Sequence, residues 1–232
     1  MTTLHSNRSP RVLQTATLAA LLTMTLGLVA CSSNMEETAA KEEGTATAAA
    51  MLPAGWSVRA DSGTGEEDKM MMMDGGAYHF MMGGAPSNNG TFYNPAWTST
   101  GDHTFTATFT QNAKATHPTS YGIMFGGQNL DAATQMYSYF LVRQAGEFYI
   151  ANRDAADVAT ISPWTANAAI MPEDANGMQT NTLSVQIAGD EVVFSVNGTE
   201  VKRLPASDLH VNGMYGFRIG HRLDVTVTDV MN

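Results

Sequence analysis

The stretch NTLSVQIAGDEVVFSVNGTEV, residues 181–201, carries the two-residue pattern that decides the fold class. Apolar side chains take every second position on both sides of a turn at Gly189-Asp190: Leu183, Val185 and Ile187 before it, and Val192, Phe194 and Val196 after it. Because successive side chains of a strand point to opposite faces, this spacing predicts two strands with one buried face each. Asn197-Gly198 then predicts a type I′ turn, which needs a positive φ at both central residues. The stretch therefore predicts consecutive antiparallel strands.

The same period of two recurs in HTFTATFTQ (103–111) and LDVTVTDV (223–230). Further strand candidates, each bounded by glycine or a turn, are GWSV (55–58), the methionine-rich pair around residues 70–82, YGIMFGG (121–127), MYSYFLVRQAGEFYIANRD (136–154), EVKRL (200–204) and GMYGFRIG (213–220). Together they give about a dozen short strands, which is typical of a sandwich or barrel. Polar residues between the apolar ones indicate one solvated face per sheet. We expect an all-β domain over residues 53–232, built as two antiparallel sheets.

The N-terminus has the anatomy of an export signal. Arg8 and Arg11 precede residues 12–30, a stretch without acidic or basic side chains. It is marginal as a membrane-spanning helix, which needs about 20 predominantly apolar residues, so we expect a cleaved signal peptide over residues 1–30. Leu28-Val29-Ala30-Cys31 resembles the bacterial lipobox, whose cysteine receives a diacylglycerol and becomes the new N-terminus.

Cys31 is the only cysteine in the sequence. A single thiol in an exported protein cannot form an internal disulfide, so a lipid anchor explains its presence. Residues 31–52 are rich in Ala, Thr and Glu and have no aromatic residue, which is typical of a flexible tether. Ser32 after the cysteine implies sorting to the outer membrane, by resemblance to lipoproteins of enteric bacteria. The predicted location is the cell envelope, facing the periplasm or the cell surface. The predicted partner is the membrane, to which the lipid on Cys31 anchors the chain.

The charge balance excludes one class of partner. Without residues 1–30 the chain has ten Lys and Arg against 22 Asp and Glu, a net charge of −12. Nucleic acid phosphates need basic side chains, so we expect no nucleic acid partner.

Five segments appear in an order that resembles a known group: THPTSYGIMFGG (116–127), YSYFLVRQAGEFYI (137–150), ISPWTANAAI (161–170), residues 181–201, and GMYGFRIGHRLDV (213–225). The order resembles the concanavalin A-like jelly-roll domain of exported bacterial proteins. That group is similar to the domain of 3-keto-disaccharide hydrolases and to family 16 glycoside hydrolase-like sandwiches. The resemblance implies a jelly-roll fold from about residue 52 onward. It implies no particular activity, because one fold hosts many functions.

The laminarinase-type catalytic motif of that group, Glu-x-Asp-x-x-Glu or a one-residue variant, is absent. The only start is Glu66-Glu67-Asp68, and the required third position falls on Met71 or Met72. We therefore predict no catalytic residues and favour a non-catalytic carbohydrate-binding module. A hydrolase acting on keto-disaccharides or glycosides, and an envelope scaffolding protein without a small ligand, remain the alternatives.

The segment DKMMMMDGGAYHFMMGG (68–84) suggests copper, because thioethers and a histidine suit Cu(I). Consecutive methionines on a strand alternate between faces, however, so only two of the four could converge with His79. Methionine is also a flexible core filler. The favoured interpretation is core packing, with no metal site and no cofactor.

Sugar rings present an apolar face to aromatic residues and hydroxyls to polar ones, so an aromatic sheet face is a candidate site. If a hairpin turns at Ala145-Gly146, one face carries Tyr137, Tyr139, Leu141, Phe148 and Ile150, and the other carries Phe140, Val142, Tyr149 and Arg153. We expect the first set to form the core. Tyr149 and Arg153 then point to the open face, joined by Arg218.

His117, Trp164 and His221 complete the predicted ligand-binding residues, because they are expected in loops beside strands, where ligand contacts concentrate. Each also has a structural alternative. Trp164 could plug one end of the sandwich, His117 could cap the turn before Pro118, and Arg218 could pair with an acid.

Overall fold

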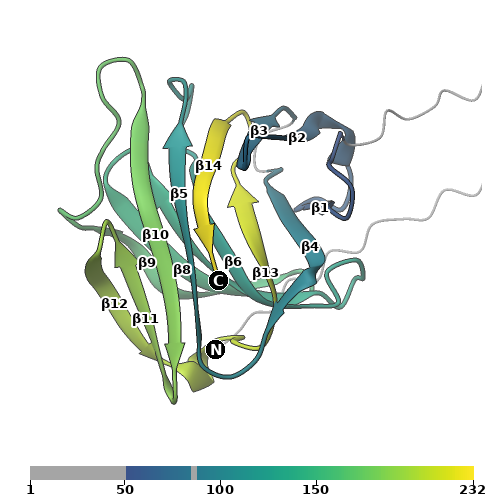
Figure 1. Cartoon of the computed structure of the whole chain (residues 1–232), viewed down its shortest axis with the longest axis vertical. Helices are drawn as coiled ribbons and strands as arrows, with labels where there is room; N and C mark the ends of the chain where they lie inside the picture. The colour runs from purple at the N-terminus through teal and green to yellow at the C-terminus, as the bar shows by residue number, and fades with distance from the viewer. Residues whose placement is uncertain (1–50, 85–87) are drawn as a thin grey trace, which may run out of the picture. The chain divides into compact units, whose positions relative to one another are not determined.

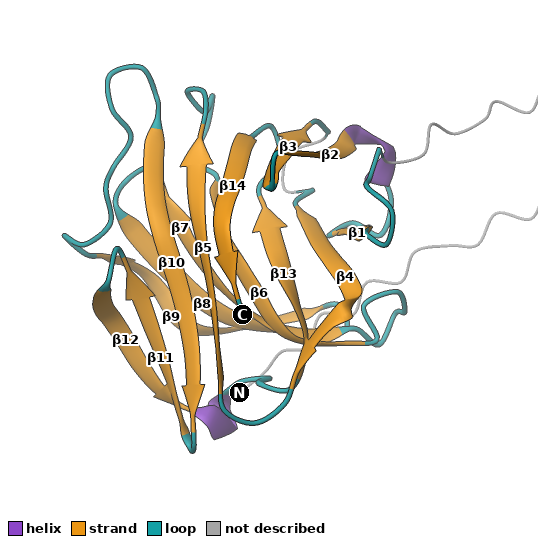
Figure 2. Cartoon of the chain, in the orientation of Figure 1, coloured by secondary structure: helices purple, strands orange, loops and turns teal. Residues whose placement is uncertain are grey.

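The computed structural model describes residues 51–84 and 88–232. The predictions for the signal peptide, Cys31 and nearly all of the tether lie outside the described residues. The described chain is all-β, as expected, with two antiparallel sheets of seven strands each (Figure 1). Its helical segments are the two short 3-10 turns η1 (Glu66–Asp68) and η2 (Ala206–Asp208), shown in purple in Figure 2. Within residues 51–84 and 88–232 no helix has the length and apolar character to cross a bilayer.

Each sheet combines strands that are distant in sequence. The first sheet has the spatial order β1 (Ser57–Ala60), β4 (Gly90–Ser99), β13 (Gly213–Ile219), β6 (Ser120–Gln128), β7 (Met136–Arg143), β8 (Glu147–Asp154) and β9 (Asp157–Ala166). The second sheet has the order β12 (Thr199–Pro205), β11 (Glu191–Val196), β10 (Gln179–Ala188), β5 (His103–Gln111), β14 (Asp224–Met231), β3 (Ala77–Met82) and β2 (Lys69–Asp74).

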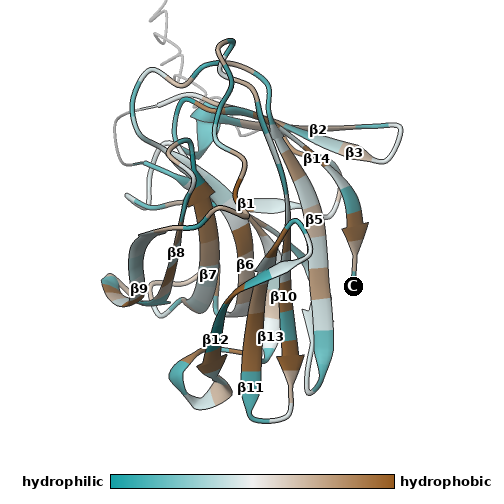
Figure 3. Ribbon diagram, turned by 90° about the vertical axis from the view of Figure 1, so that its left-hand side faces the viewer, coloured by the Kyte–Doolittle hydropathy of each residue, from teal (hydrophilic) through white to brown (hydrophobic). Residues whose placement is uncertain are grey.

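The stretch at residues 181–201 folds as its pattern predicts. Ala188 pairs with Glu191 across the Gly189-Asp190 turn that joins β10 and β11. Asn197 and Gly198 have φ values of 50° and 79° and join β11 to β12, which confirms the type I′ prediction. The six alternating apolar residues of the pattern, three on β10 and three on β11, are buried between the sheets. Figure 3 shows the alternation of brown and pale segments along β5 and β10.

The core between the sheets is centred on aromatic rings. Phe217 of β13 is fully buried, and its ring centroid lies within about 6 Å of six other rings: Trp56, Tyr78, Phe80, Trp97, Phe105 and Phe109. These rings come from both sheets and from the segment before β1. One side chain therefore joins strands from distant parts of the sequence.

Two strands, β4 and β9, were not expected from the sequence, and each contains a proline. Pro95 of β4 lies beyond Tyr93, where pairing with β1 ends, and in a register shift against β13. Pro163 lies on the edge strand β9, where Ile150 and Phe148 of β8 pair with Ser162 and Thr165, so the proline occupies a bulge. Proline cannot donate to a sheet ladder and is tolerated at such positions.

The predicted faces of the β7–β8 hairpin were wrong by one residue of register. Arg143 pairs with Glu147, so the loop has three residues, 144–146, instead of a two-residue turn. A one-residue shift exchanges the faces of one strand relative to the other. Phe140, Val142, Phe148 and Ile150 therefore lie in the core between the sheets. Tyr137, Tyr139 and Leu141, which were expected in that core, lie on the outer face with Tyr149.

Candidate functional site

An aromatic row crosses the outer face of the first sheet. It consists of Tyr137 and Tyr139 of β7, Tyr149 of β8 and Trp164 of β9. The ring centroids are 5.8 Å apart from Tyr137 to Tyr139, 6.1 Å from Tyr139 to Tyr149 and 5.1 Å from Tyr149 to Trp164. These contacts belong to a second apolar cluster, separate from the core between the sheets. The outer face is therefore a packed layer in its own right.

Two arginines lie on the rings of the aromatic row. The Arg218 guanidinium carbon is 4.7 Å from the Tyr139 ring centroid, and that of Arg143 is 4.3 Å from the Trp164 centroid. Both distances suit a cation–π interaction. Arg143 Nε also donates to Glu147 Oε2 at 2.6 Å. Trp164 is thus held between Arg143 and Tyr149, with a fixed ring plane next to the solvent.

Arg218 forms a buried ion pair with Asp61. Its Nη1 donates to Asp61 Oδ1 at 2.9 Å and its Nη2 to Oδ2 at 2.6 Å, while the Arg218 side chain is only 6% exposed. Nη1 also donates to Thr91 Oγ1 at 2.9 Å and to the Tyr137 hydroxyl at 3.1 Å. Arg218 therefore does pair with an acid, as the structural alternative expected, and it orients the aromatic row from beneath.

Burial and charge compete in this pair, and charge prevails. Burial opposes ionisation of Asp61, but the Arg218 guanidinium, with further help from Asn89 and Arg153, lowers the pKa of Asp61 below its ordinary value. Burial likewise opposes the charge on Arg218, and the Asp61 carboxylate outweighs it, so the pKa of Arg218 is raised. Burial raises the pKa of Tyr139 to about 12, so this phenol stays neutral. The pair is ionised at neutral pH.

Asn89 connects the ion pair to two stacked histidines. Its Nδ2 donates to Asp61 Oδ2 at 3.0 Å, and its Oδ1 accepts from the His221 backbone N–H at 3.2 Å. The His221 ring stacks on His117, with centroids 4.3 Å apart and planes inclined by 21°. Burial, followed by the charges of His117, Arg222 and Lys69, lowers the pKa of His221, so its neutral imidazole is favoured. A neutral imidazole has one donor and one acceptor nitrogen.

Two adjoining hollows open beside Trp164 and the histidines. One has a volume of about 220 Å³ and is lined by Asn89, Pro118, Thr119, Ser120, Arg143, Trp164 and His221. The other, about 370 Å³, shares Pro118 and Arg143 with it and adds His117 and Glu173 among its lining residues. Within the described part of the chain, two buried polar atoms here, Thr119 Oγ1 and His117 Nε2, have no hydrogen-bond partner. Unsatisfied buried groups carry a desolvation cost.

The structure gathers four of the six predicted site residues around these hollows. Trp164 and His221 line the smaller hollow, His117 stacks on His221 and lines the larger one, and Tyr149 packs against Trp164. Trp164 was expected in a loop and lies instead on strand β9, because the sequence reading missed that strand.

The other two predicted residues lie further along the same face. Arg218 is buried beneath the tyrosines. Arg153 pairs across the strands with Tyr137, and its Nε donates to the Ala155 carbonyl at 2.8 Å. Neither is among the lining residues of the two hollows.

Sequence reasoning missed Asp61, Asn89, Tyr139 and Arg143. Asp61 and Arg218 are 157 positions apart, and the sequence gives no signal that pairs them. Tyr139 and Arg143 share one strand face with Leu141, so the period of two would have placed them on the site face once the hairpin loop had the right length.

The fold and this outer face define a concanavalin A-like β-sandwich with one polar and aromatic candidate binding surface. Among solved structures, the chain is similar to the carbohydrate-binding module CBM66 from Bacillus subtilis, with 14% identity, a TM-score of 0.55, and coverage of 76% of this chain and 93% of that one. It is also similar to a Bacillus subtilis protein of unknown function with a galectin-like fold, with 11% identity, a TM-score of 0.50, and coverage of 75% and 87%.

A third similar structure is the GH16 protein of a Bacteroides ovatus mixed linkage glucan PUL in complex with a G4G4G3G product, with 8% identity, a TM-score of 0.50, and coverage of 78% and 97%. No protein-family model matches the chain, and no curated protein matches it in sequence. At these identities the likeness concerns the fold.

Proposed function

We propose that this chain is a carbohydrate-binding module whose site is the pair of hollows beside Trp164. The observation that carries the proposal is the pairing of an indole ring, held by Arg143 and Tyr149, with the polar side chains Asn89, Ser120 and His221 in the lining of the same hollow. A sugar ring offers an apolar face for the indole and hydroxyls for the polar side chains of the lining. The similar folds of a carbohydrate-binding module and of a glucan-bound GH16 protein support the same ligand class.

Binding fits the site better than glycoside cleavage. Retaining cleavage needs two carboxylates about 5–5.5 Å apart. The described lining of the smaller hollow contains no Asp or Glu, and the larger one contributes Glu173 alone. Asp61 and Glu147, two further acids, are engaged by Arg218 and Arg143. The polar groups at the hollows are therefore suited to hydrogen bonding with a sugar.

Trp164→Ala is expected to weaken sugar binding about tenfold, which is about 1.4 kcal/mol, because it removes the stacking surface. A glycan array with the full chain selects the ligand, and calorimetry then measures the affinity of each variant. Val158→Ala, which shortens a 46%-exposed side chain on the same strand, is the matched control and should leave the affinity unchanged.

Tryptophan fluorescence gives an independent readout of the same site. Trp56 and Trp97 lie in the ring cluster between the sheets, so the ligand-induced emission change should vanish in Trp164→Phe. Absence of binding to any glycan, or a Trp164→Ala variant that binds as well as the wild type, would disprove the assignment.

We also propose that the module is held at the cell envelope, as an outer-membrane lipoprotein, by a lipid on Cys31. The support is the lipobox-like Leu28-Val29-Ala30-Cys31 at the end of an export signal. Each buried methylene adds about 0.8 kcal/mol to membrane binding, so a diacylated cysteine anchors durably.

Cys31→Ser should therefore move the protein from the membrane pellet to the soluble fraction after cell fractionation. Ser32→Ala keeps the cysteine and should leave the protein in the pellet. A Cys31→Ser variant that still sediments with the envelope would refute the anchor.

A further inference from the structure

Three methionine side chains and one histidine side chain share the outer face of the β2–β3 hairpin, at the edge of the second sheet. They are Met70 and Met72 of β2 and His79 and Met81 of β3, called here the Met-His quartet. Burial alternates along β3 and along the first three residues of β2. Met71 and Met82 are 1% and 6% exposed in the core, whereas Met72 is 38% exposed. The expected core packing thus holds for Met71 and Met82 and fails for the other four methionines of the hairpin.

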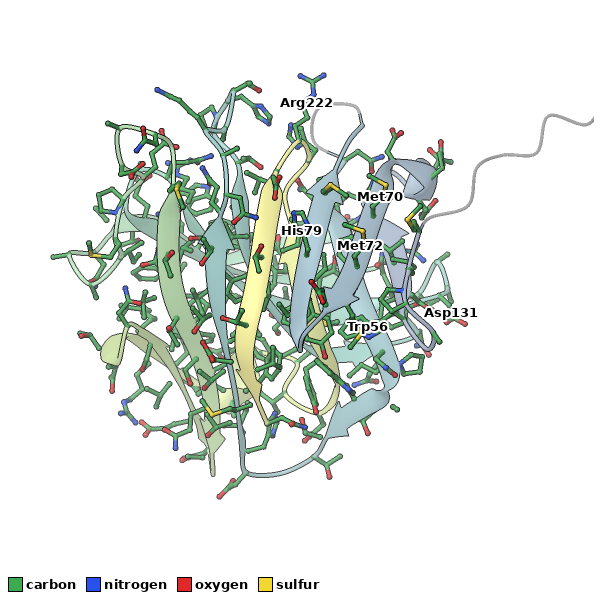
Figure 4. The ribbon with its side chains drawn as sticks, turned by 45° about the horizontal axis from the view of Figure 1, so that its top comes forward. Trp56, Met70, Met72, His79, Asp131 and Arg222 are labelled. Carbon is green, nitrogen blue, oxygen red and sulfur yellow. The ribbon has the colours of Figure 1, made fainter. Side chains whose placement is uncertain are left out.

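The strand register brings the quartet into a compact square. Met70 pairs directly with Met81, and Met72 pairs directly with His79. Directly opposed residues on one sheet face have Cβ atoms about 4.5–5.5 Å apart. Figure 4 shows Met70, Met72 and His79 together on one face of the hairpin. Alternation along β2 alone allows two methionines to converge with His79, and the register with β3 adds Met81 as a third thioether.

An acid orients the histidine from behind. His79 Nε2 lies 2.7 Å from Asp224 Oδ1 on the neighbouring strand β14. Asp224 is itself fixed by Asn112, whose Nδ2 donates to the same Oδ1 at 2.7 Å. A carboxylate that accepts from one imidazole nitrogen leaves the other as a lone-pair donor, which is the arrangement around metal-ligating histidines.

A hollow beside the quartet gives access from solvent. Its volume is about 520 Å³, and it is lined by Met70, Met81, Asp224, Glu67, Asp68 and Arg222 among others. Three carboxylates against one guanidinium give the rim a net negative charge, which favours the approach of a cation.

We infer that the Met-His quartet binds one monovalent soft cation, Cu(I) or its analogue Ag(I), through three thioethers and the imidazole of His79. Thioether ligands select Cu(I) over Zn(II), which prefers thiolate, imidazole and carboxylate. The described residues contain no group of three or more His, Cys, Asp or Glu able to hold a metal ion, so a methionine site has no competing cluster of that kind there. The site lies on the second sheet, and it is independent of sugar binding on the first.

Methyl NMR with Ag(I) tests the inference directly. The full chain carries Cys31→Ser, so that the free thiol cannot take the metal, and its methionine methyl groups are labelled with ¹³C. One equivalent of Ag(I) should shift the methyl signals of Met70, Met72 and Met81 and leave that of Met73 in place. Met73 belongs to the same tract and is 51% exposed, but it pairs with Tyr78 away from the quartet.

Anaerobic titration of Cu(I) against a coloured chelator then gives the affinity. The double variant Met70→Leu/Met81→Leu should bind Cu(I) at least tenfold more weakly, and Met73→Leu should bind like the parent. Leucine conserves volume and apolarity, so these variants keep the fold. His79→Leu should also lower the affinity for Cu(I). In the parent protein, added Zn(II) should not displace bound Cu(I).

Equal shifts of Met73 and the quartet methyls would indicate unspecific thioether binding and overturn the inference. Failure of either metal to bind, or full affinity in Met70→Leu/Met81→Leu, would overturn it as well.

Discussion

Asp61→Asn is expected to lower the free energy of unfolding by about 3–5 kcal/mol at pH 7, because it leaves the Arg218 guanidinium buried without its counter-charge. Asparagine is close in size to aspartate, so the variant removes charge while keeping the packing. Urea denaturation followed by circular dichroism measures the change as a lower midpoint with an unchanged slope.

The same pair predicts how stability depends on acid. The folded-state pKa of Asp61 is depressed below its ordinary value, so its contribution is fully present above the unfolded pKa of about 3.9 and is lost as pH falls through the folded value. The wild type should thus lose stability over this range, and Asp61→Asn should lose less, since it has no carboxylate to protonate there.

Glu200→Gln is the matched control, because it removes one acid from an exposed Arg203 pair and should shift the midpoint little. If Asp61→Asn unfolds at the wild-type midpoint, Arg218 does not depend on its partner. That result would contradict the description of the outer face as a layer organised by this pair.

Phe217→Ala is expected to lose about 3–5 kcal/mol of the free energy of unfolding, because it leaves a cavity where six rings from both sheets meet. Thermal and urea unfolding measure the loss. Phe217→Leu, which refills part of the cavity, should recover some of it.

Met231→Ala shortens a 60%-exposed side chain at the end of β14 and should change the stability by less than about 0.5 kcal/mol. Equal effects of Phe217→Ala and Met231→Ala would show that the ring cluster is not the centre of the core.

Asp61→Asn and Phe217→Ala test the two faces of the first sheet. Phe217 and Arg218 are neighbours on β13, and the period of two sends the ring into the core and the guanidinium to the outer face. Arg218 supports Tyr139, and Tyr139 contacts Tyr149, which contacts Trp164. Loss of the ion pair should therefore reach the proposed sugar site through three ring contacts.

The amino-acid sequence by itself determined the fold class, because burial at every second residue is a local property that residues 181–201 display without their neighbours. The Asn197-Gly198 turn was equally local, since only residues that tolerate positive φ fit it. The two strands that the sequence did not predict, β4 and β9, show where local patterns stop being sufficient. Pro95 and Pro163 weaken the strand signal, and only the partner strands reveal that both lie where no ladder hydrogen bond is needed.

Tertiary structure decided which residues form the sites. The 144–146 loop has one residue more than the predicted turn, so the faces of β7 are exchanged relative to the prediction and Tyr139 lies on the outer face. Asp61 and Asn89 reach that face from loops far away in sequence, and Met81 joins Met70 only through the register of β2 with β3. Side-chain alternation is encoded within each strand, whereas the partner of a strand and its register depend on the packing of the whole sandwich.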